Sequence, residues 1–241
     1  MKAFAAILLS VLAGCAVPAA QEPAVPGESY RAFLADPVRT DRDRRMDASR
    51  HPVELLQFAQ VRPGMRVLDV SAGAGYTSQL LALAVGPSGK VWAQSPKPGA
   101  ALTERMAAHP QPNLVLAARP FEDPVPPDAP PLDLVTLVLN YHDISYLPVD
   151  RDAMNRKIFA ALKPGGRYVI VDHSALPGTG ITAGRTLHRI DKAFVIEEVE
   201  RAGFALDAEG AFLRNAADTR EGSSSQPNPP SDKFVLRFVK R

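Results

Sequence analysis

Two stretches of this 241-residue chain bring together residues whose types and spacing suit ligand binding or catalysis. In the first, an apolar run at residues 67–70 contains Asp69 and leads directly into the small residues Ser71, Gly73 and Gly75. An apolar helical pattern follows at residues 80–83. Glycine leaves the backbone uncovered, so a ligand can approach the main chain between a strand and a helix. This pattern indicates a site for a nucleotide-like cofactor.

The second stretch is Asn140-Tyr141-His142-Asp143, which follows a long apolar run at residues 132–139. Four polar side chains at the end of a buried strand need hydrogen-bond partners, so one interpretation is a satisfied polar network. The strand end also faces the crevice where ligands bind in open α/β sheets, which favours substrate binding or catalysis. His142 is the preferred general base because its ordinary pKa lies near neutrality. Tyr141, Asp143 and, after the next strand, His173 are the other catalytic candidates.

The spacing in the first stretch favours some cofactors over others. A nicotinamide fingerprint requires G-x-G-x-x-G and an acid about 20 residues later. Here Ser78 stands at the third glycine position, and the acid, Asp69, comes before the glycines. The loop also lacks the Gly-Lys-Ser/Thr sequence that holds phosphate. A dinucleotide site and a turn without a ligand remain alternatives.

Strand-like and helix-like runs alternate along the chain. Strands are predicted at residues 67–70, 91–93, 113–116, 132–139, 167–171, 204–206 and 233–239, and helices at 29–34, 53–59, 100–108, 151–162 and 190–202. This alternation, closed by two strands around a Ser/Pro-rich loop, predicts a doubly wound α/β sheet with a terminal hairpin.

The motif Asp69-x-Ser71-x-Gly73-x-Gly75 resembles motif I of class I S-adenosylmethionine (SAM) methyltransferases, with serine at the first glycine position. The turn at residues 162–166 is similar to the one before strand five in many of these enzymes. Residues 140–143, 171–174 and 187–191 resemble a group of exported bacterial proteins called predicted methyltransferases. The resemblance covers residues 52–241. It implies a mostly parallel, seven-stranded Rossmann-like sheet with an antiparallel last strand, and SAM-dependent methyl transfer to an unidentified small molecule.

The resemblance also implies roles for individual residues. Asp69 orients the loop and helps to hold the cationic methionine end of SAM, while Ser71, Gly73 and Gly75 allow close backbone approach. Gln94 stands where the family has an acid that binds the ribose hydroxyls. The remaining expected cofactor contacts are Phe121 and Glu122, beside the adenine, and Asn140.

Asp143, Asp172 and His173 would occupy strand ends comparable to those that ligate magnesium in catechol-type O-methyltransferases. Imidazole suits transition metals better than magnesium, and we expect structural hydrogen bonding here and no metal. A second function also remains open, a non-catalytic module that binds a nucleoside or SAM-like ligand. Gln94 weakens the expected ribose contact, and SAM is made in the cytoplasm although the chain is expected to be exported.

The N-terminus predicts export. Lys2 and a short apolar run precede Leu12-Ala13-Gly14-Cys15, which resembles a bacterial lipobox, so residues 1–15 are expected to be a signal peptide with a lipidated cysteine. Residues 16–28 then form a linker and residues 29–241 the methyltransferase-like domain. The chain is expected to be a periplasmic lipoprotein that contacts a membrane only through Cys15. Cleavage after this segment, without lipid, and a cytosolic protein with an apolar leader are alternatives.

The charge distribution argues against nucleic-acid binding and indicates how residues 39–50 are placed. The net charge of +2 is small and mixed in sign, which gives no case for nucleic-acid binding. Residues 39–50 alternate in charge and are expected to form a solvated helix face. In similar proteins a segment before motif I covers the cofactor, so Asp47 or Arg50 would reach the ligand.

Overall fold

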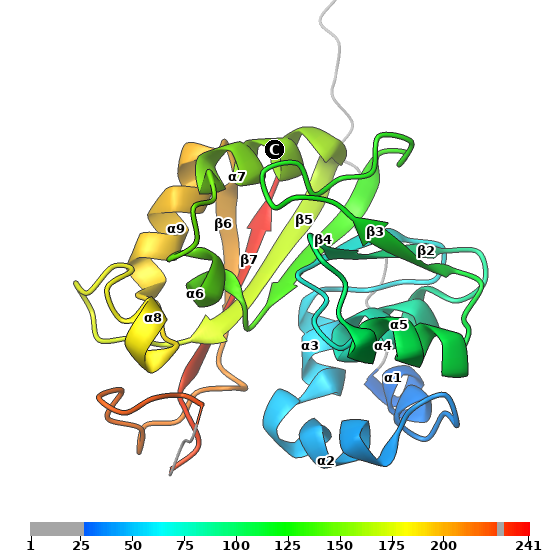
Figure 1. Cartoon of the computed structure of the whole chain (residues 1–241), viewed down its shortest axis with the longest axis horizontal. Helices are drawn as coiled ribbons and strands as arrows, with labels where there is room; N and C mark the ends of the chain where they lie inside the picture. The colour runs from blue at the N-terminus through cyan, green and yellow to red at the C-terminus, as the bar shows by residue number, and fades with distance from the viewer. Residues whose placement is uncertain (1–26, 226–228) are drawn as a thin grey trace, which may run out of the picture.

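Seven strands form one sheet in the order β3-β2-β1-β4-β5-β7-β6. The computed structural model describes residues 27–225 and 229–241 (Figure 1). Strands β1 to β5 are parallel, and β7 runs antiparallel to both β5 and β6, which confirms the predicted fold class. The bounds are β1 (Arg66–Val70), β2 (Lys90–Ser95), β3 (Leu114–Ala118), β4 (Leu132–Val138), β5 (Leu162–His173), β6 (Ala205–Gly210) and β7 (Lys233–Val239).

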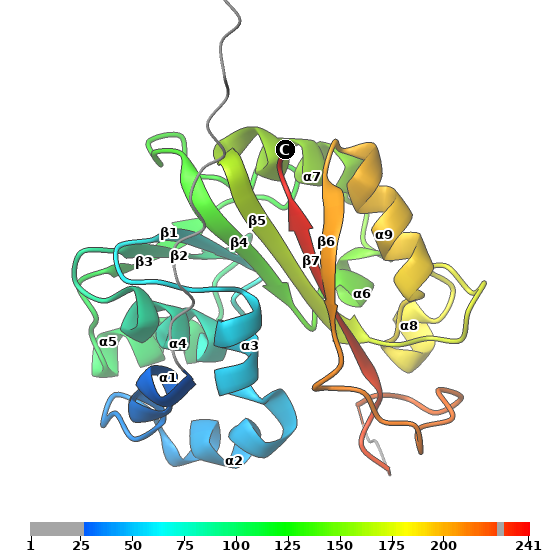
Figure 2. The ribbon, with the colours of Figure 1, turned by 180° about the vertical axis from the view of Figure 1, so that it is seen from behind.

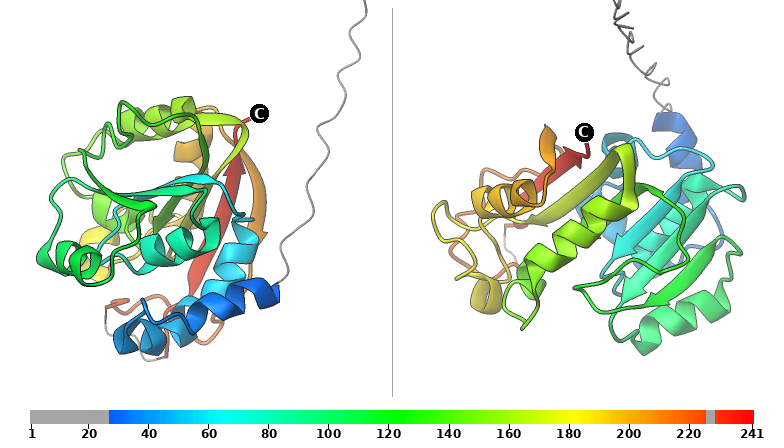
Figure 3. Two further views of the ribbon diagram at one scale, coloured as in Figure 1. Left: turned by 90° about the vertical axis from the view of Figure 1, so that its right-hand side faces the viewer. Right: turned by 90° about the horizontal axis from the view of Figure 1, so that it is seen from above.

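Helices cover both faces of the sheet, as the views from behind and from the side show (Figures 2 and 3). One hydrophobic cluster joins the sheet to α1, α3, α4 and α5, and the other joins it to α6, α7 and α9. The bounds are α1 (Gly27–Leu34), α2 (Asp41–Arg50), α3 (Pro52–Phe58), α4 (Tyr76–Val85), α5 (Ala100–Ala108), α6 (Tyr141–Ile144), α7 (Arg151–Ala161), α8 (Gly184–Leu187) and α9 (Lys192–Arg201).

The central strands are apolar on both sides because both sides are covered. In β1, Val67 belongs to the cluster under α4, while Leu68 and Val70 belong to the cluster under α7. Successive side chains of a strand point to opposite faces, so Asp69 points to the α4 side with Val67. This alternation places the one carboxylate of β1 beneath the helix that follows the motif I loop.

The start of β5 and two short helices differ from the sequence-based assignment. Strand β5 begins at Leu162, earlier than expected, because Leu162 pairs with Leu132 and Gly165 donates a backbone hydrogen bond to Lys240. The short helices α6 and α8 were not predicted at all. Each is four residues long, too short to show a helical repeat of apolar residues.

The expectation of a solvated face at residues 39–50 is wrong for part of α2. Asp43 is 1% exposed and forms two hydrogen bonds with Arg105 of α5, at 2.7 and 2.8 Å. Arg39, 3% exposed, forms a bidentate pair with Asp47. Alternating charges predict exposure only where no other element packs against the helix, and here α5 does.

The predicted signal peptide, lipobox and most of the linker lie outside the described residues. Helix α1 begins at Gly27, inside the range assigned to the linker. In the part of the chain that the structure describes, no helix has the length and apolar character needed to cross a membrane.

Candidate functional site

The motif I loop connects β1 to α4 and has a left-handed backbone at three positions, Ser71 (φ 57°), Gly73 (φ 57°) and Gly75 (φ 83°). The two glycines serve different purposes. Gly73 is exposed, and a Cβ added there would meet only the Ser71 carbonyl oxygen, at 4.0 Å. A Cβ at Gly75 would lie 2.9 Å from side-chain atoms of Leu102 and Arg105. Gly73 therefore leaves the outer side of the loop open, whereas Gly75 lets α5 pack against it.

Asp69 supports this loop from beneath. Its carboxylate is 2% exposed and accepts hydrogen bonds from Ser78 of α4 at 2.5 Å and Thr136 of β4 at 2.7 Å. Burial raises the pKa of Asp69 to about 6, against the lowering effect of the two hydroxyl donors. The carboxylate thus ties β1, α4 and β4 together, and its predicted hold on the methionine end of SAM stays a prediction.

Gln94 is the second-last residue of the neighbouring strand β2 and is fully buried. Its Oε1 accepts a hydrogen bond from the Ser71 backbone N–H at 2.9 Å, and its Nε2 donates one to the Arg119 carbonyl at 2.6 Å. Both ends of the amide are therefore engaged within the protein. The side chain lies beside the motif I loop, as expected, but the structure shows it bracing that loop, and the ribose contact stays a prediction.

The two residues expected beside the adenine lie after β3. Phe121 is partly buried and packs against the cluster on the α7 side of the sheet. Glu122 is half-buried, and no described residue makes a hydrogen bond with its carboxylate. The adenine contacts of this pair stay predictions.

The polar stretch after β4 divides into two groups. Asn140 accepts a hydrogen bond from Ser71 Oγ at 2.6 Å, which joins it to the motif I loop. Tyr141 instead turns into the core, where it is fully buried, donates to Glu198 at 2.7 Å and accepts from Asn155 at 2.9 Å. The catalytic role expected for Tyr141 disagrees with this placement, because α6 rotates its side chain away from the strand end.

His142 and Asp143 lie together at the strand end. The Nδ1 of His142 lies 2.6 Å from Asp172 Oδ1, and its Nε2 lies 3.3 Å from Asp143 Oδ1. Burial by itself lowers the pKa of His142, but its hydrogen bonds to Asp143 and Asp172 outweigh this effect and raise the pKa to about 9. Burial by itself raises the pKa of Asp143, but the hydrogen bond and charge of His142 outweigh it and lower the pKa to about 2. A pKa of about 9 favours the cationic ring, with both nitrogens protonated, at neutral pH, so the predicted role of His142 as a base requires one ring proton to leave first.

Two further histidines stand beside His142. The ring of His173 lies 5.7 Å from it and the ring of His188 lies 5.6 Å from it, between centroids. Burial, followed by the nearby charge of Lys233, lowers the pKa of His173 to about 3, so its ring is neutral. His188 Nδ1 lies 3.3 Å from Asp143 Oδ1. Sequence spacing gave no sign of this last pair, because 45 residues separate its members.

Known proteins resemble the chain in both sequence and fold. Residues 28–96 match the family model of protein-L-isoaspartate(D-aspartate) O-methyltransferase. Over 122 residues the chain is 30% identical to the ubiquinone/menaquinone biosynthesis C-methyltransferase UbiE of Burkholderia cenocepacia (strain HI2424), a match that covers 48% of this chain and 46% of that protein. The chain thus spans about half the length of such relatives.

Solved structures share the fold over most of the chain. A SAM-dependent methyltransferase from Aquifex aeolicus matches with a TM-score of 0.60 and 17% identity, over 90% of this chain and 100% of its own. This chain has the fold of a class I SAM-dependent methyltransferase. Aeropyrum pernix fibrillarin, solved with natively bound SAM, matches with a TM-score of 0.50 and 13% identity, over 74% of this chain and 68% of its own. The resemblance in motif I is therefore confirmed at the level of the class.

Proposed function

We propose that this methyltransferase-fold protein binds SAM against the motif I loop and transfers its methyl group to a small-molecule acceptor at the end of β4. The observation that carries the proposal is the open outer side of the loop at Gly73, beside which Ser71 bonds to Asn140 and Asn140 in turn bonds to Asp143. SAM carries its methyl group on a sulfonium; the acceptor attacks the methyl carbon in line with the C–S bond, and S-adenosylhomocysteine leaves with the bonding pair. Holding the two reactants in line is worth up to roughly 7–11 kcal/mol, so the protein needs no nucleophile of its own.

The residues near the loop fit such a cofactor. Arg50 is half-buried and its guanidinium lies 5.7 Å from the centroid of the Tyr76 ring, at the start of α4. Burial lowers the pKa of Arg50, and within residues 27–225 and 229–241 no carboxylate pairs with it. A half-buried cation that no described carboxylate neutralises favours an anionic group of a ligand, and the methionine carboxylate of SAM is such a group. Arg50 would hold that carboxylate, and the bare backbone at Gly73 would admit the rest of the cofactor.

SAM binding is tested by calorimetry on the protein and on two matched glycine variants. Gly73→Ala places a methyl group on the open side of the loop. Gly165→Ala does the same near the amino-terminal end of β5, at the opposite end of the strands, where φ is 76° and nothing lies within 4 Å. Both changes strain a left-handed backbone. We expect SAM to bind the unchanged protein and the Gly165 variant, and to bind the Gly73 variant at least tenfold more weakly. Absence of binding heat from the unchanged protein overturns the proposal.

A second candidate is a module that binds SAM or a related nucleoside without catalysis. Gln94 favours it, because its amide is already bonded at both ends and cannot give a ribose hydroxyl the charged acceptor expected in the family. Production of S-adenosylhomocysteine is measured with a panel of hydroxyl, amine and carbon acceptors. Turnover with any of them supports the enzyme, and binding without turnover across the panel supports the module.

We further propose that the chain is exported and anchored by a lipid at Cys15. The support is the apolar run before Leu12-Ala13-Gly14-Cys15 and the presence of a single cysteine in the chain. Labelled fatty acid should enter the expressed protein and should not enter a Cys15→Ala variant. Equal labelling of the two proteins contradicts this part of the proposal.

A further inference from the structure

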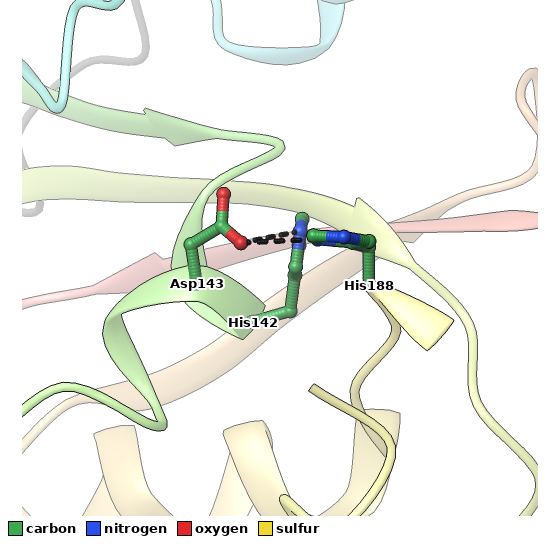
Figure 4. Close-up of side chains that lie close together, drawn as sticks. All are labelled: His142, Asp143 and His188. Carbon is green, nitrogen blue, oxygen red and sulfur yellow. Dashed lines mark hydrogen bonds and ion pairs between the residues drawn. The ribbon is translucent and has the colours of Figure 1, made fainter. Parts of the chain in front are cut away.

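Three side chains from two separate segments meet at the end of β4. His142, Asp143 and His188 each offer one ligand atom, and these atoms all lie within 4.8 Å of one another (Figure 4). Asp143 Oδ1 lies 3.3 Å from His142 Nε2 and 3.3 Å from His188 Nδ1. We propose that the three residues bind one divalent transition-metal ion.

The two distances suit shared coordination. Two ligand atoms about 2.0–2.1 Å from one Zn²⁺ at a tetrahedral angle lie roughly 3.3–3.4 Å apart. Both histidine–aspartate separations equal this spacing. The rings are almost perpendicular, at 88°, and approach from different elements. The three ligand atoms are therefore nearly in place before an ion arrives.

Behind the cluster, a buried carboxylate orients His142. Asp172 is 0% exposed, and its Oδ1 lies 2.6 Å from His142 Nδ1 while its Oδ2 accepts the His142 backbone N–H at 2.8 Å. An ion at the site displaces the proton on Nε2. The proton held on Nδ1 by the Asp172 carboxylate remains, so the Nε2 lone pair of the ring faces Asp143 and the ion. Ligand histidines in metal sites commonly have a carboxylate in this position. Asp172 is thus a positioning residue for the proposed ion.

His188 is also held in an unusual conformation. Its φ is 50°, in the left-handed region that costs most residues about 1–2 kcal/mol. Ser224 fixes the segment by donating its hydroxyl to the His188 carbonyl at 2.7 Å and its backbone N–H to the Leu187 carbonyl at 2.9 Å. The structure therefore keeps the ring beside Asp143 at a cost in backbone strain, as is common at binding sites.

The donor set indicates the class of ion. Two imidazoles and one carboxylate suit zinc, iron or cobalt, whereas magnesium prefers oxygen ligands. Three protein ligands leave at least one position for water or an oxygen of a small molecule. Asn140 also donates to Asp143, at 3.2 Å, and accepts from Ser71, so the proposed ion adjoins the motif I loop. The metal set differs from the one weighed from sequence, since Asp172 lies behind His142 and His173 is bonded to Ser231.

Metal binding is measured on the full chain without SAM, so the result does not depend on the proposed methyl transfer. The protein is titrated with Co²⁺ by visible absorption and then with Zn²⁺ or Mg²⁺ as competitor. His188→Asn and Asp143→Asn each remove one ligand at a half-exposed position, and asparagine tolerates the left-handed backbone at residue 188. His51→Asn is the matched control, because His51 is also a left-handed histidine at a helix end, with φ 47°.

We expect one Co²⁺ per chain, displaced by Zn²⁺ and not by Mg²⁺. Losing an outer-shell partner alone weakens metal binding by about 10–100-fold, so each ligand variant should lose at least that much affinity. The His51 variant should bind as the unchanged protein does, and thermal melting checks that all variants fold. Lack of stoichiometric binding, or equal binding by the unchanged protein and the His188 variant, overturns the proposal.

Discussion

Ser71 Oγ donates a 2.6 Å hydrogen bond to Asn140 Oδ1 and so joins the motif I loop to the polar stretch after β4. The two residues are 69 positions apart, yet β1 and β4 are parallel neighbours, and their carboxyl ends bring the two loops together. Serine stands where the family has glycine, at φ 57°. The substitution therefore adds a contact between the cofactor loop and the proposed acceptor side.

Substitutions at Ser71 separate this contact from the backbone strain. Ser71→Ala keeps the left-handed strain and loses the bond to Asn140, so we expect a loss of about 1 kcal/mol in the free energy of unfolding. Ser71→Gly loses the same bond but relieves strain of about 1–2 kcal/mol, and should remain close to the unchanged protein. Urea unfolding measures the free energy of unfolding of the unchanged protein and the two variants. Equal stability of the alanine and glycine variants would show that residue 71 is not strained.

Restoring the family's acid at residue 94 should destabilise the protein. In the unchanged protein, Gln94 Nε2 donates a 2.6 Å hydrogen bond to the Arg119 carbonyl. Gln94→Glu removes this donor and places a carboxylate oxygen against the carbonyl oxygen. A buried acceptor left without its donor costs about 1–3 kcal/mol, and a charged group costs more. Thermal unfolding and SAM calorimetry should both show a loss. Tighter SAM binding with unchanged stability would instead show that position 94 can reach the ribose.

The buried pair between Asp43 and Arg105 should dominate the stability of α2. Asp43→Asn leaves a buried guanidinium without its charge partner and should cost about 3–5 kcal/mol. Asp41→Asn is the matched control on the same helix, because the Asp41 side chain is 88% exposed and its ion pair is with Arg44, which is itself 42% exposed. We expect little change from the control in urea unfolding, and equal losses from both variants would falsify the assignment.

The same pair predicts a dependence on acid. Burial by itself raises the pKa of Asp43, but the hydrogen bonds from Arg105 outweigh it and hold the pKa at about 2, below its ordinary 3.8. A lowered folded-state pKa contributes stability above pH 4 and loses it as the pH falls toward 2. The stability difference between the unchanged protein and Asp43→Asn should therefore shrink over this range. A constant difference from pH 5 to pH 2 speaks against the ion pair.

Sequence patterns predicted the parts of the fold that depend on local order. Apolar runs indicated where each strand lies, although β5 begins earlier and β6 ends later than expected, and the helix at residues 100–108 was placed at the bounds of α5. They could not show that Asp43 is buried, since α5 covers it from another part of the chain. The site was predicted only in part. Motif I and residues 140–143 were found from their sequence patterns. The contact between His188 and Asp143 could not be found this way, because it depends on α8 packing against α6. Tyr141 was misplaced because α6 was not foreseen.

Asp69 should make the protein less stable as the pH rises from acid toward neutral. Burial raises its pKa to about 6, from an ordinary value of 3.8, against the opposing effect of its hydrogen bonds from Ser78 and Thr136. A group whose folded-state pKa is raised stabilises the fold below its unfolded pKa, and this contribution is lost as the pH passes through the folded value. The protonated carboxyl is therefore favoured below pH 4, and ionising it above pH 6 costs free energy.

Asp69→Asn removes this ionisation while keeping the shape of the side chain. The hydroxyls of Ser78 and Thr136 can each turn to donate or accept, so both can bond the amide. Two pKa units correspond to about 3 kcal/mol, and we expect the stability of the variant relative to the unchanged protein to rise by up to that amount between pH 4 and pH 7. Groups that titrate in both proteins cancel in this difference, which urea unfolding measures at each pH. A difference that does not change with pH means that the Asp69 carboxyl is as easily ionised in the fold as in water.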